Sequence, residues 1–509
     1  RAAIDALRGI NTDWNDILFR DTFNQEYNLS VSGGSDKATY YTSLGFQDEQ
    51  GNVPGVSMNR LNFVAKTSYR LSSKFKVGAS IFANRRKNKT YLTDNDGFTN
   101  PVYYSRRANP YQTPYDADGD YIYDTDIQGR EDSDLKFNIF EERNDYTQET
   151  TGVTALVDAD FRFTDWLKAV TQVGFQLDHV DLQNFASKDT YAMRKEFYRS
   201  EVMGSDGVRR SFLPDGGRHY QSKSTNKQIN WKLQVEFSKR LAPDHELEAM
   251  AGTEIRKTWY DYFSATAYGY DRKTLTSKPV IFPNESWART FPLHSESVSE
   301  NAYASFYATT SYSLMRRYTL GASVRFDGSD LFGVDKKYRF LPLYSFSALW
   351  RISDEPFMRP VTAISNLALR VSYGIQGNID KSTSSYVMGS YNNISLLPGV
   401  TEDVIVLGNP PNRRLRWEKT HTANAGLDIS VLDNAITLSA DAYYRRGNDL
   451  IALKMLPLET GFMSTLVNWA SMRNRGIEFA LSTRNISTAR FRWTTNFNIA
   501  YNENKVLQE

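Results

Sequence analysis

A tyrosine-rich segment between residues 103 and 123 holds the side chains best suited to binding chemistry. Flat aromatic faces cover the apolar faces of sugar rings, and neighbouring polar groups bind hydroxyls or peptide amides, so this mixture suits an oligomeric polar ligand. A second interpretation is that the tyrosines pack the segment against itself or against a partner protein. The candidate ligand-binding residues are Tyr103, Tyr104, Arg106, Tyr111, Tyr115, Asp116, Asp118, Tyr121 and Tyr123.

Aspartates alternate from Asp116 to Asp120 with the spacing that opens a calcium-binding EF-hand loop. The match ends there, because Tyr121 stands where that loop needs glycine. Ile127 also stands where the loop needs a bidentate glutamate. We therefore expect a tight acidic turn around Gly119 and no metal site.

Signatures of catalysis are weak in this sequence. The HELEA stretch at His245 lacks the second histidine of a zinc-protease helix, and the sequence has neither a GxSxG elbow nor a phosphate-binding glycine loop. The lack of cysteine removes thiol nucleophiles and thiolate metal sites together. A net charge of +2 gives no electrostatic case for nucleic acid. We expect neither an enzyme nor a bound cofactor.

Apolar residues recur at every second position along much of the chain. In the stretch that begins at Ile229, Trp231 and Leu233 fall on the same face of an extended strand as Ile229, whereas Lys232 and Glu236 fall on the other. We identify about 16 such segments of about 9 to 13 residues, a length that suits tilted strands crossing a bilayer. Strands of soluble sheets are usually shorter, at about 5 or 6 residues.

Short and long connections alternate between these segments. Short links are expected at about 32–37, 70–74, 164–166, 433–434 and 485–490, and long loops at about 85–146, 180–223, 259–298, 378–416 and 447–472. Long loops without secondary structure are uncommon unless they are functional. A membrane-spanning antiparallel β-barrel explains the alternation, because one rim carries tight turns and the other carries long extracellular loops. We expect an N-terminal segment over 1–24 that leads into a barrel over 25–509.

The cost of burying charge determines which face meets lipid. Placing Lys232 against hydrocarbon would cost up to about 2 to 4 kcal/mol at the bilayer midplane, and Glu236 would cost somewhat less. The face with Ile229 and Trp231 therefore points outward, and the charged face lines a wet lumen. No stretch approaches the roughly 18 consecutive apolar residues that a spanning helix needs. A mean hydropathy of −0.54 is compatible with strands that show only alternate residues to lipid.

Aromatic residues make up 14% of the chain. Many stand near the ends of expected strands, where interfacial girdles form, although strands in general also favour aromatic residues. Helices are expected only at 2–7 and 354–365, the second with Ser353 as its cap and Pro356 near its first turn. The aromatic residues at strand ends include Tyr40, Tyr41, Trp166, Trp259, Tyr260, Trp350 and Tyr501.

Six stretches of the sequence resemble SusC/RagA-type TonB-dependent outer-membrane transporters. The longest is NLSVSGGSDKATYYTSLGFQDEQGNV at 28–53, which follows TDWNDILF at 12–19. Each match alone is weak, but together they stand in the family's order over nearly the whole chain. The others are RFDGSDLFG (325–333), WRISDEPFM (350–358), LALRVSYGIQGN (367–378), NRGIEFAL (474–481) and WTTNFNIAYNENKV (493–506).

The resemblance implies a Gram-negative outer-membrane barrel of about 22 strands filled by an N-terminal plug. It also implies import of oligosaccharides or peptides, a SusD-like lipoprotein that caps the barrel, and TonB acting on the plug. The plug, the first strand and the last strands are not found in this sequence. The glycines of DGSDLFG and YGIQGN are interpreted as scaffold positions where strands give way to loops.

Two other functions remain open from the sequence. A passive outer-membrane porin is compatible with about 16 strands. A soluble carbohydrate-binding β protein would instead place the alternating apolar residues between stacked layers.

Overall fold

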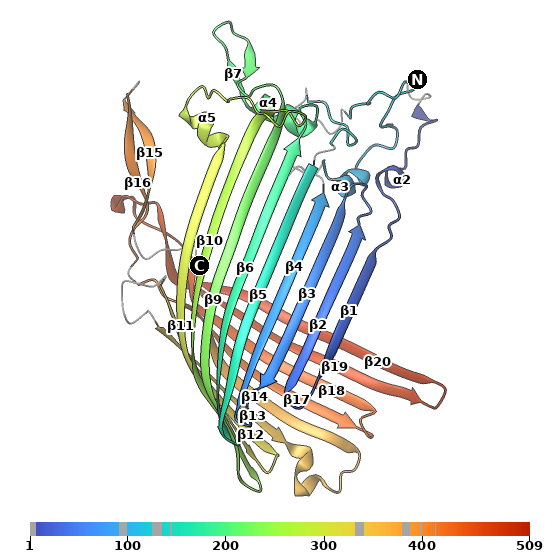
Figure 1. Cartoon of the computed structure of the whole chain (residues 1–509), viewed down its shortest axis with the longest axis vertical. Coiled ribbons are helices and arrows are strands. Elements are labelled where there is room, and N and C mark those ends of the chain that lie inside the picture. The colour runs from blue at the N-terminus through green and yellow to red at the C-terminus, as the bar shows by residue number, and fades with distance from the viewer. Residues whose placement is uncertain are drawn as a thin grey trace.

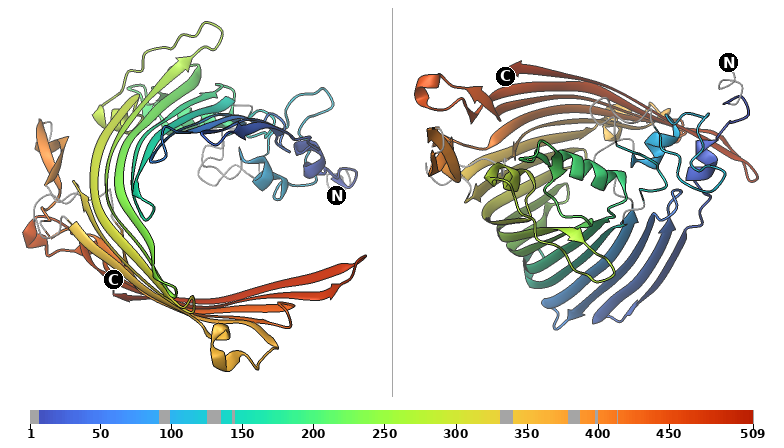
Figure 2. Two further views of the ribbon diagram at one scale, coloured as in Figure 1. Left: turned by 60° about the horizontal axis from the view of Figure 1, so that its bottom comes forward. Right: turned by 90° about the horizontal axis from the view of Figure 1, so that it is seen from above.

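The computed structural model describes residues 7–90, 99–124, 135–142, 145–330, 340–378, 387–397, 400–412 and 414–508. Sixteen antiparallel strands form one sheet, from β1 (Gln25–Gly34) at one edge to β20 (Arg492–Gln508) at the other. The sheet curves into an open arc (Figures 1 and 2). Among the described residues, no pairing joins its two edges. The expected up-and-down antiparallel architecture and the expected number of strands are confirmed.

The strands between these edges follow the chain in order. They are β2 (Ala38–Gln50), β3 (Ser57–Arg70), β4 (Phe75–Thr90), β5 (Asp145–Thr164), β6 (Leu167–Ala186), β9 (Gly217–Ala242), β10 (His245–Tyr270), β11 (His294–Leu314), β12 (Tyr318–Ser329), β13 (Phe340–Arg351), β14 (Ile364–Asn378), β17 (Glu418–Val431), β18 (Ile436–Met455) and β19 (Ser464–Ser487). Two hairpins lie outside the sheet, namely β7 (Glu201–Met203) with β8 (Arg209–Ser211), and β15 (Met388–Leu397) with β16 (Val400–Asn409).

Helices are few and short. They are α2 (Trp14–Leu18), α3 (Pro101–Ser105), α4 (Tyr191–Arg199) and α5 (Glu285–Thr290), with the 3-10 helices η2 (Ile352–Asp354), η3 (Pro356–Met358) and η4 (Leu458–Thr460). None of the helices in the described part of the chain has the length and apolar character needed to cross a membrane.

The connections differ sharply between the two rims of the sheet (Figure 1). Most connections at one end are tight, as after β1, β3, β5, β9, β11, β17 and β19, and we call this end the short-turn rim. The opposite end carries the connections after β4, β6, β10 and β14, with α3, α4, α5 and the two hairpins, and we call it the long-connection rim. This segregation follows from antiparallel order, in which every second connection returns to the same end.

The strands extend further than hydropathy indicates. Four of the expected long loops are therefore shorter in the structure. Those expected at 85–146, 180–223, 259–298 and 447–472 span 91–144, 187–216, 271–293 and 456–463. In these extensions the alternation fades while cross-strand hydrogen bonding continues. Both faces are polar near Ser222 to Gln228 of β9, whereas both are apolar at Leu450 to Leu453 of β18. The interval expected at 378–416 lies at 379–417.

The helix expected over 354–365 is wrong. Two 3-10 turns, η2 and η3, occupy its first part, and β14 begins at Ile364. Between the turns Glu355 is extended, with φ −75° and ψ 147°. The ring of Pro356 disfavours helical angles at the preceding residue and so separates the two turns. Ser353 makes no capping bond, because it lies inside η2. The helix expected at 2–7 lies outside the described residues except for Leu7.

The two faces of the sheet differ in polarity and exposure. On β9 the exposed fractions of Ile229, Trp231 and Leu233 are 44%, 39% and 37%, whereas Gln234 on the other face is only 7% exposed. The face with Gln234 also carries Ala186 and Tyr268, which pack against α4, and α4 lies over the hollow side of the arc in Figure 2. The apolar face is therefore convex and the polar face concave.

Candidate functional site

The concave wall carries cross-strand networks of charged side chains. Arg370 of β14 binds Asp428 of β17, with Nε–Oδ2 and Nη2–Oδ1 distances of 2.7 and 3.1 Å. Its Nη2 also donates to Asp441 of β18 at 3.1 Å, and Ser439 donates to Asp428 at 2.6 Å. One guanidinium thus holds two carboxylates from neighbouring strands on the lumen side.

A glycine makes this arrangement possible. Gly426 pairs with Arg370 on one side and with Asp441 on the other. A β-carbon at Gly426 would collide with the Asp441 carboxylate and with the Arg370 guanidinium. The close approach of the charged groups therefore requires glycine at this strand position.

A second network lies on the concave face of β10 to β12. Arg325 contacts Asp327 at 2.6 Å and Glu254 at 3.4 Å. The guanidinium of Arg256 lies 4.5 Å from the centre of the Tyr303 ring. The wall facing the lumen thus offers cations, carboxylates and an aromatic face to a polar solute.

The tyrosine-rich segment lies at the long-connection rim, beside the N-terminal segment and α4 (Figure 1). We call residues 12–19 with α2, the described part of 99–142 and α4 the rim layer. Its core includes Trp14, Tyr104, Phe137 and Tyr191. The Trp14 indole nitrogen donates to the Asn109 carbonyl at 3.0 Å, which ties the N-terminal segment to the 99–142 connection.

Tyr104 packs the rim layer. It is 2% exposed, and its ring centre lies 5.0 Å from that of Trp14 and 5.5 Å from that of Phe137. Its hydroxyl donates to Asp124 at 3.0 Å. Burial, together with the charge of Asp124, raises the pKa of Tyr104. Direct ligand contact, considered for this residue from the sequence, does not fit this burial, because helix α3 turns its side chain into the core.

The other candidate tyrosines form two exposed groups. Tyr103 lies on α3, with the Arg107 guanidinium 4.8 Å from its ring centre. Tyr115 and Tyr121 bridge the acidic turn, with ring centres 5.4 Å apart. Tyr111 stands between these groups in sequence and is 52% exposed. Arg106, Asp116 and Asp118 are also exposed.

The acidic stretch is a tight turn. The Asp116 carboxylate accepts from the backbone amides of Asp118 and Asp120 at 3.0 and 2.8 Å. Gly119 has a φ of +88°. Glycine adopts such a positive φ without strain, because it has no β-carbon. The sequence expectation of a turn around Gly119 is confirmed, and Asp116 serves it as an internal acceptor.

Tyr123 and Glu142 join the 99–142 connection to α4. Arg194 of α4 lies 5.7 Å from the centre of the half-buried Tyr123 ring and binds Glu141 at 2.7 Å. Glu142 accepts a hydrogen bond from the Tyr191 amide at the first turn of α4. Burial raises the pKa of Glu142 to about 7, although the hydrogen bond from the Tyr191 amide opposes this shift.

Sequence reasoning missed the partners in these networks. Alternation placed charged residues on the lumen side, but it could not pair Arg370 with Asp428 and Asp441 across three strands. Glu142 has no local signal at all, because its partner helix begins at Tyr191. The one detectable signal was Gly426, a glycine inside an alternating strand, which indicates a close approach.

Comparison with known proteins identifies a family over most of the chain. The sequence model described as TonB dependent receptor-like, beta-barrel matches residues 84–507. TonB-dependent receptor P26 of Formosa agariphila is 27% identical over 504 residues, which is 98% of this chain and 47% of that protein. TonB-dependent receptor SusC of Bacteroides thetaiotaomicron is 25% identical over 525 residues, or 98% of this chain and 48% of that protein. The chain spans about half the length of these relatives.

A solved structure shares the fold. The RagAB peptide transporter structure contains a chain that superposes with a TM-score of 0.77 at 21% identity, covering 98% of this chain and 52% of that one. The curved antiparallel sheet of this chain therefore has the same fold as part of that structure.

Proposed function

The chain belongs to the TonB-dependent receptor-like β-barrel family and is of the SusC/RagA type, and from that premise we propose that the intact protein imports oligosaccharides or peptides across the outer membrane. The family is one of Gram-negative outer-membrane barrels, which agrees with the apolar convex face. The observation that carries the proposal is the family match over 84–507. Active import is thereby favoured over the passive porin and the soluble carbohydrate-binding protein considered from the sequence.

The concave wall supports a path for a large polar solute. Charged groups such as Arg325 and Arg370 alternate with carboxylates, so hydroxyls, amides or termini of an oligomer find partners on the wall without one tight site. Aromatic faces such as that of Tyr303, beneath Arg256, add apolar contact for sugar rings or peptide side chains. This combination suits passage of a ligand that exchanges contacts as it moves.

We assign the long-connection rim to the cell exterior and the first contact with the solute. The exposed residues Tyr103, Arg106, Tyr111, Tyr115 and Tyr121 of the rim layer are our candidate contacts. Tyr104 and Tyr123 hold these residues in place. A SusD-like surface lipoprotein is the proposed partner at this rim, and TonB is the proposed source of force through a plug.

The test is uptake by cells that carry or lack the gene for the intact protein. Fluorescent oligosaccharides and peptides of graded length are supplied with and without an uncoupler of the inner-membrane proton gradient. We expect uptake of one class to require both the gene and the gradient. Uptake that survives the uncoupler would identify a passive porin instead, and recovery of the protein from the soluble fraction would remove membrane transport altogether.

The proposed partner has its own test. An affinity tag on the intact protein is used to purify it in mild detergent, and co-purification of a SusD-like lipoprotein is the expected result. The amount of co-purified lipoprotein is then compared between two variants. One lacks the β15–β16 hairpin and the other lacks the β7–β8 hairpin, and both hairpins lie at the long-connection rim. Recovery of the intact protein without such a lipoprotein, under conditions that preserve uptake, would contradict the proposed partnership.

A further inference from the structure

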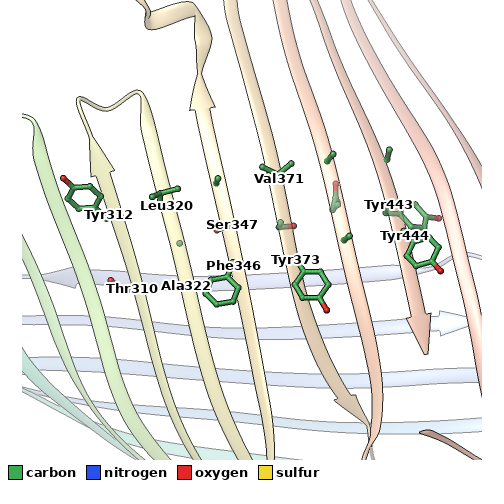
Figure 3. Close-up of a pocket in the computed structure, with 17 residues that line it drawn as sticks. Thr310, Tyr312, Leu320, Ala322, Phe346, Ser347, Val371, Tyr373, Tyr443 and Tyr444 are labelled. Carbon is green, nitrogen blue, oxygen red and sulfur yellow. The ribbon is translucent and has the colours of Figure 1, made fainter. Parts of the chain in front are cut away.

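The convex face contains a groove among its apolar side chains (Figure 3). A cross-strand row runs from Ala348 of β13 through Val371 of β14 and Ala425 of β17 to Ala442 of β18. The next row on the same face carries large aromatic residues at Phe346, Tyr373 and Tyr444. Small side chains beside large ones leave a hollow of about 860 Å³.

A second hollow of about 610 Å³ lies beside the first, over β9 to β13. The two share Thr310, Ala322 and Phe346, and they extend from this junction to opposite sides along the wall. Both lie in the band of exposed apolar side chains that meets the lipid of the outer membrane. A ligand with two apolar chains joined at one end fits two hollows that meet at one place.

The junction lies close to the short-turn rim. The pair Thr310–Ala322 is followed along the strands by the pair Leu314–Tyr318, which closes the β11–β12 turn. The rings of Tyr318 and Trp350 stack there with centres 6.4 Å apart. Aromatic residues of this kind mark the interface between acyl chains and headgroups.

Exposed arginines occupy the same rim. Arg316 lies in the β11–β12 turn and Arg359 follows η3, whereas Arg351 ends β13 on the concave face, because it pairs with Ala368 in the same row as Asp428. In the part of the chain that the structure describes, Arg316 and Arg359 take part in no ion pair, whereas the neighbouring Arg317 contacts Glu355 at 3.3 Å. The acidic residues nearby are Asp354, Glu355 and Asp244, whose backbone carbonyl accepts a hydrogen bond from the Met315 amide. Two exposed arginines thus stand at headgroup level below the junction of the hollows.

We propose that the two convex hollows and these two arginines bind one anionic glycerophospholipid of the leaflet at the short-turn rim. Its acyl chains lie in the hollows and its phosphate meets Arg316 and Arg359. The hollows continue the lipid-facing surface, so an acyl chain enters them without leaving the bilayer. Arginine forms charge-assisted hydrogen bonds to phosphate, and basic groups at the membrane surface favour anionic lipids.

The test uses the intact protein purified in mild detergent and native mass spectrometry with added phosphatidylglycerol or phosphatidylethanolamine. We expect one retained phosphatidylglycerol per protein. The R316A/R359A variant is expected to lower its occupancy by about fivefold per arginine, because each basic group near a membrane surface contributes about 1 kcal/mol. The matched variant R70A/K74A removes two cations from the same rim away from the hollows and is expected to retain the lipid.

A second pair of variants tests the hollows. Ala425→Trp fills the first hollow and is expected to lower retention of both lipids, whereas Ala155→Trp on the convex face of β5 leaves retention unchanged. Both variants keep an apolar residue toward lipid, and heat-dependent mobility on gels verifies that each is folded. Equal retention in Ala425→Trp and Ala155→Trp, or equal losses in R316A/R359A and R70A/K74A, would overturn the proposal.

Discussion

The sheet and the rim layer of this protein are held together in different ways. In the sheet, each strand contacts its sequence neighbours, and a pattern with period two determines which face meets lipid. In the rim layer, Trp14, Tyr104, Phe137 and Tyr191 come from four distant parts of the chain and form one core. The comparison teaches that local pattern dictates the sheet, whereas single long-range contacts dictate the surface above it.

The largest expected effect concerns Tyr104. Removing a buried aromatic side chain lowers the free energy of unfolding by about 3 to 5 kcal/mol. Tyr104→Ala should therefore unfold the rim layer locally while the sheet stays folded. Hydrogen exchange of amides 99–124 is expected to accelerate strongly, while amides of β9 and β10 stay protected. Tyr104→Phe keeps the ring and loses only the bond to Asp124, so it serves as the milder control. Equal acceleration in both regions would show that they do not fold separately.

A charge on the convex face comes next. Val173 of β6 is 46% exposed on that face, and Val173→Arg is expected to cost about 2 to 4 kcal/mol near the bilayer midplane. Gln172→Arg, one residue away on the concave wall, is the matched control and should cost far less. Urea unfolding in lipid vesicles measures both. A greater loss in Gln172→Arg would reverse our assignment of the two faces.

Aromatic contacts in the rim layer should affect uptake more than stability. Tyr111→Ala and Tyr115→Ala each remove an exposed ring, and we expect about 2- to 10-fold slower uptake of the transported oligomer. Tyr391→Ala in the β15–β16 hairpin removes another exposed tyrosine at the same rim and serves as the control. Unchanged uptake in the first two variants would leave these tyrosines with a packing role only.

The Arg370 network should contribute modestly to sheet stability. Arg370 is partly exposed to the lumen, so each of its ion pairs is worth at most about 1 kcal/mol. A double-mutant cycle with Arg370→Ala and Asp428→Ala isolates the coupling between the two side chains. Coupling that does not weaken in high salt would contradict a water-filled lumen.

The smallest effect is a pH dependence confined to the rim layer. Burial raises the pKa of Glu142 to about 7 in the folded state, above its ordinary value of 4.5. Because protonation favours the folded form of such a group, its stabilising contribution is complete below about pH 4.5 and is lost as the pH rises through 7. The protection of the α4 amides, which measures how far their exchange is slowed below the intrinsic base-catalysed rate, should therefore fall between about pH 5.5 and about pH 8. Glu142→Gln should remove this dependence, and its persistence would point to another group.

The sequence predicted the fold well because a barrel wall repeats one simple rule. Alternation in β9 placed Trp231 outward and Lys232 inward, and antiparallel order sent the long connections to one rim. Strand ends were harder to predict, because hydrogen bonding between strands continues beyond the stretch in which apolar residues alternate. β10, with 26 residues, is an example. The helix predicted from Ser353 and Pro356 failed because proline also constrains the residue before it.

The candidate site was predicted only in part. Composition singled out the tyrosines of 103–123 as candidate contacts, which stay a prediction, and the residue types predicted the turn at Gly119. The burial of Tyr104 depends on Trp14 and Phe137, which no local pattern connects to it. The concave networks likewise depend on register between strands, which hydropathy restricts but does not specify residue by residue.

The most direct test of the two-faced wall is cysteine labelling along β9. The chain has no cysteine, so single substitutions at positions 229 to 236 report one side chain each. In lipid vesicles, Asn230→Cys, Lys232→Cys and Glu236→Cys should react with a charged aqueous reagent, whereas position 234 is too buried to be informative. Cysteines at the four alternate positions should resist that reagent and respond to a lipid-soluble quencher. Labelling without a period of two, or with the two sets exchanged, would contradict the account.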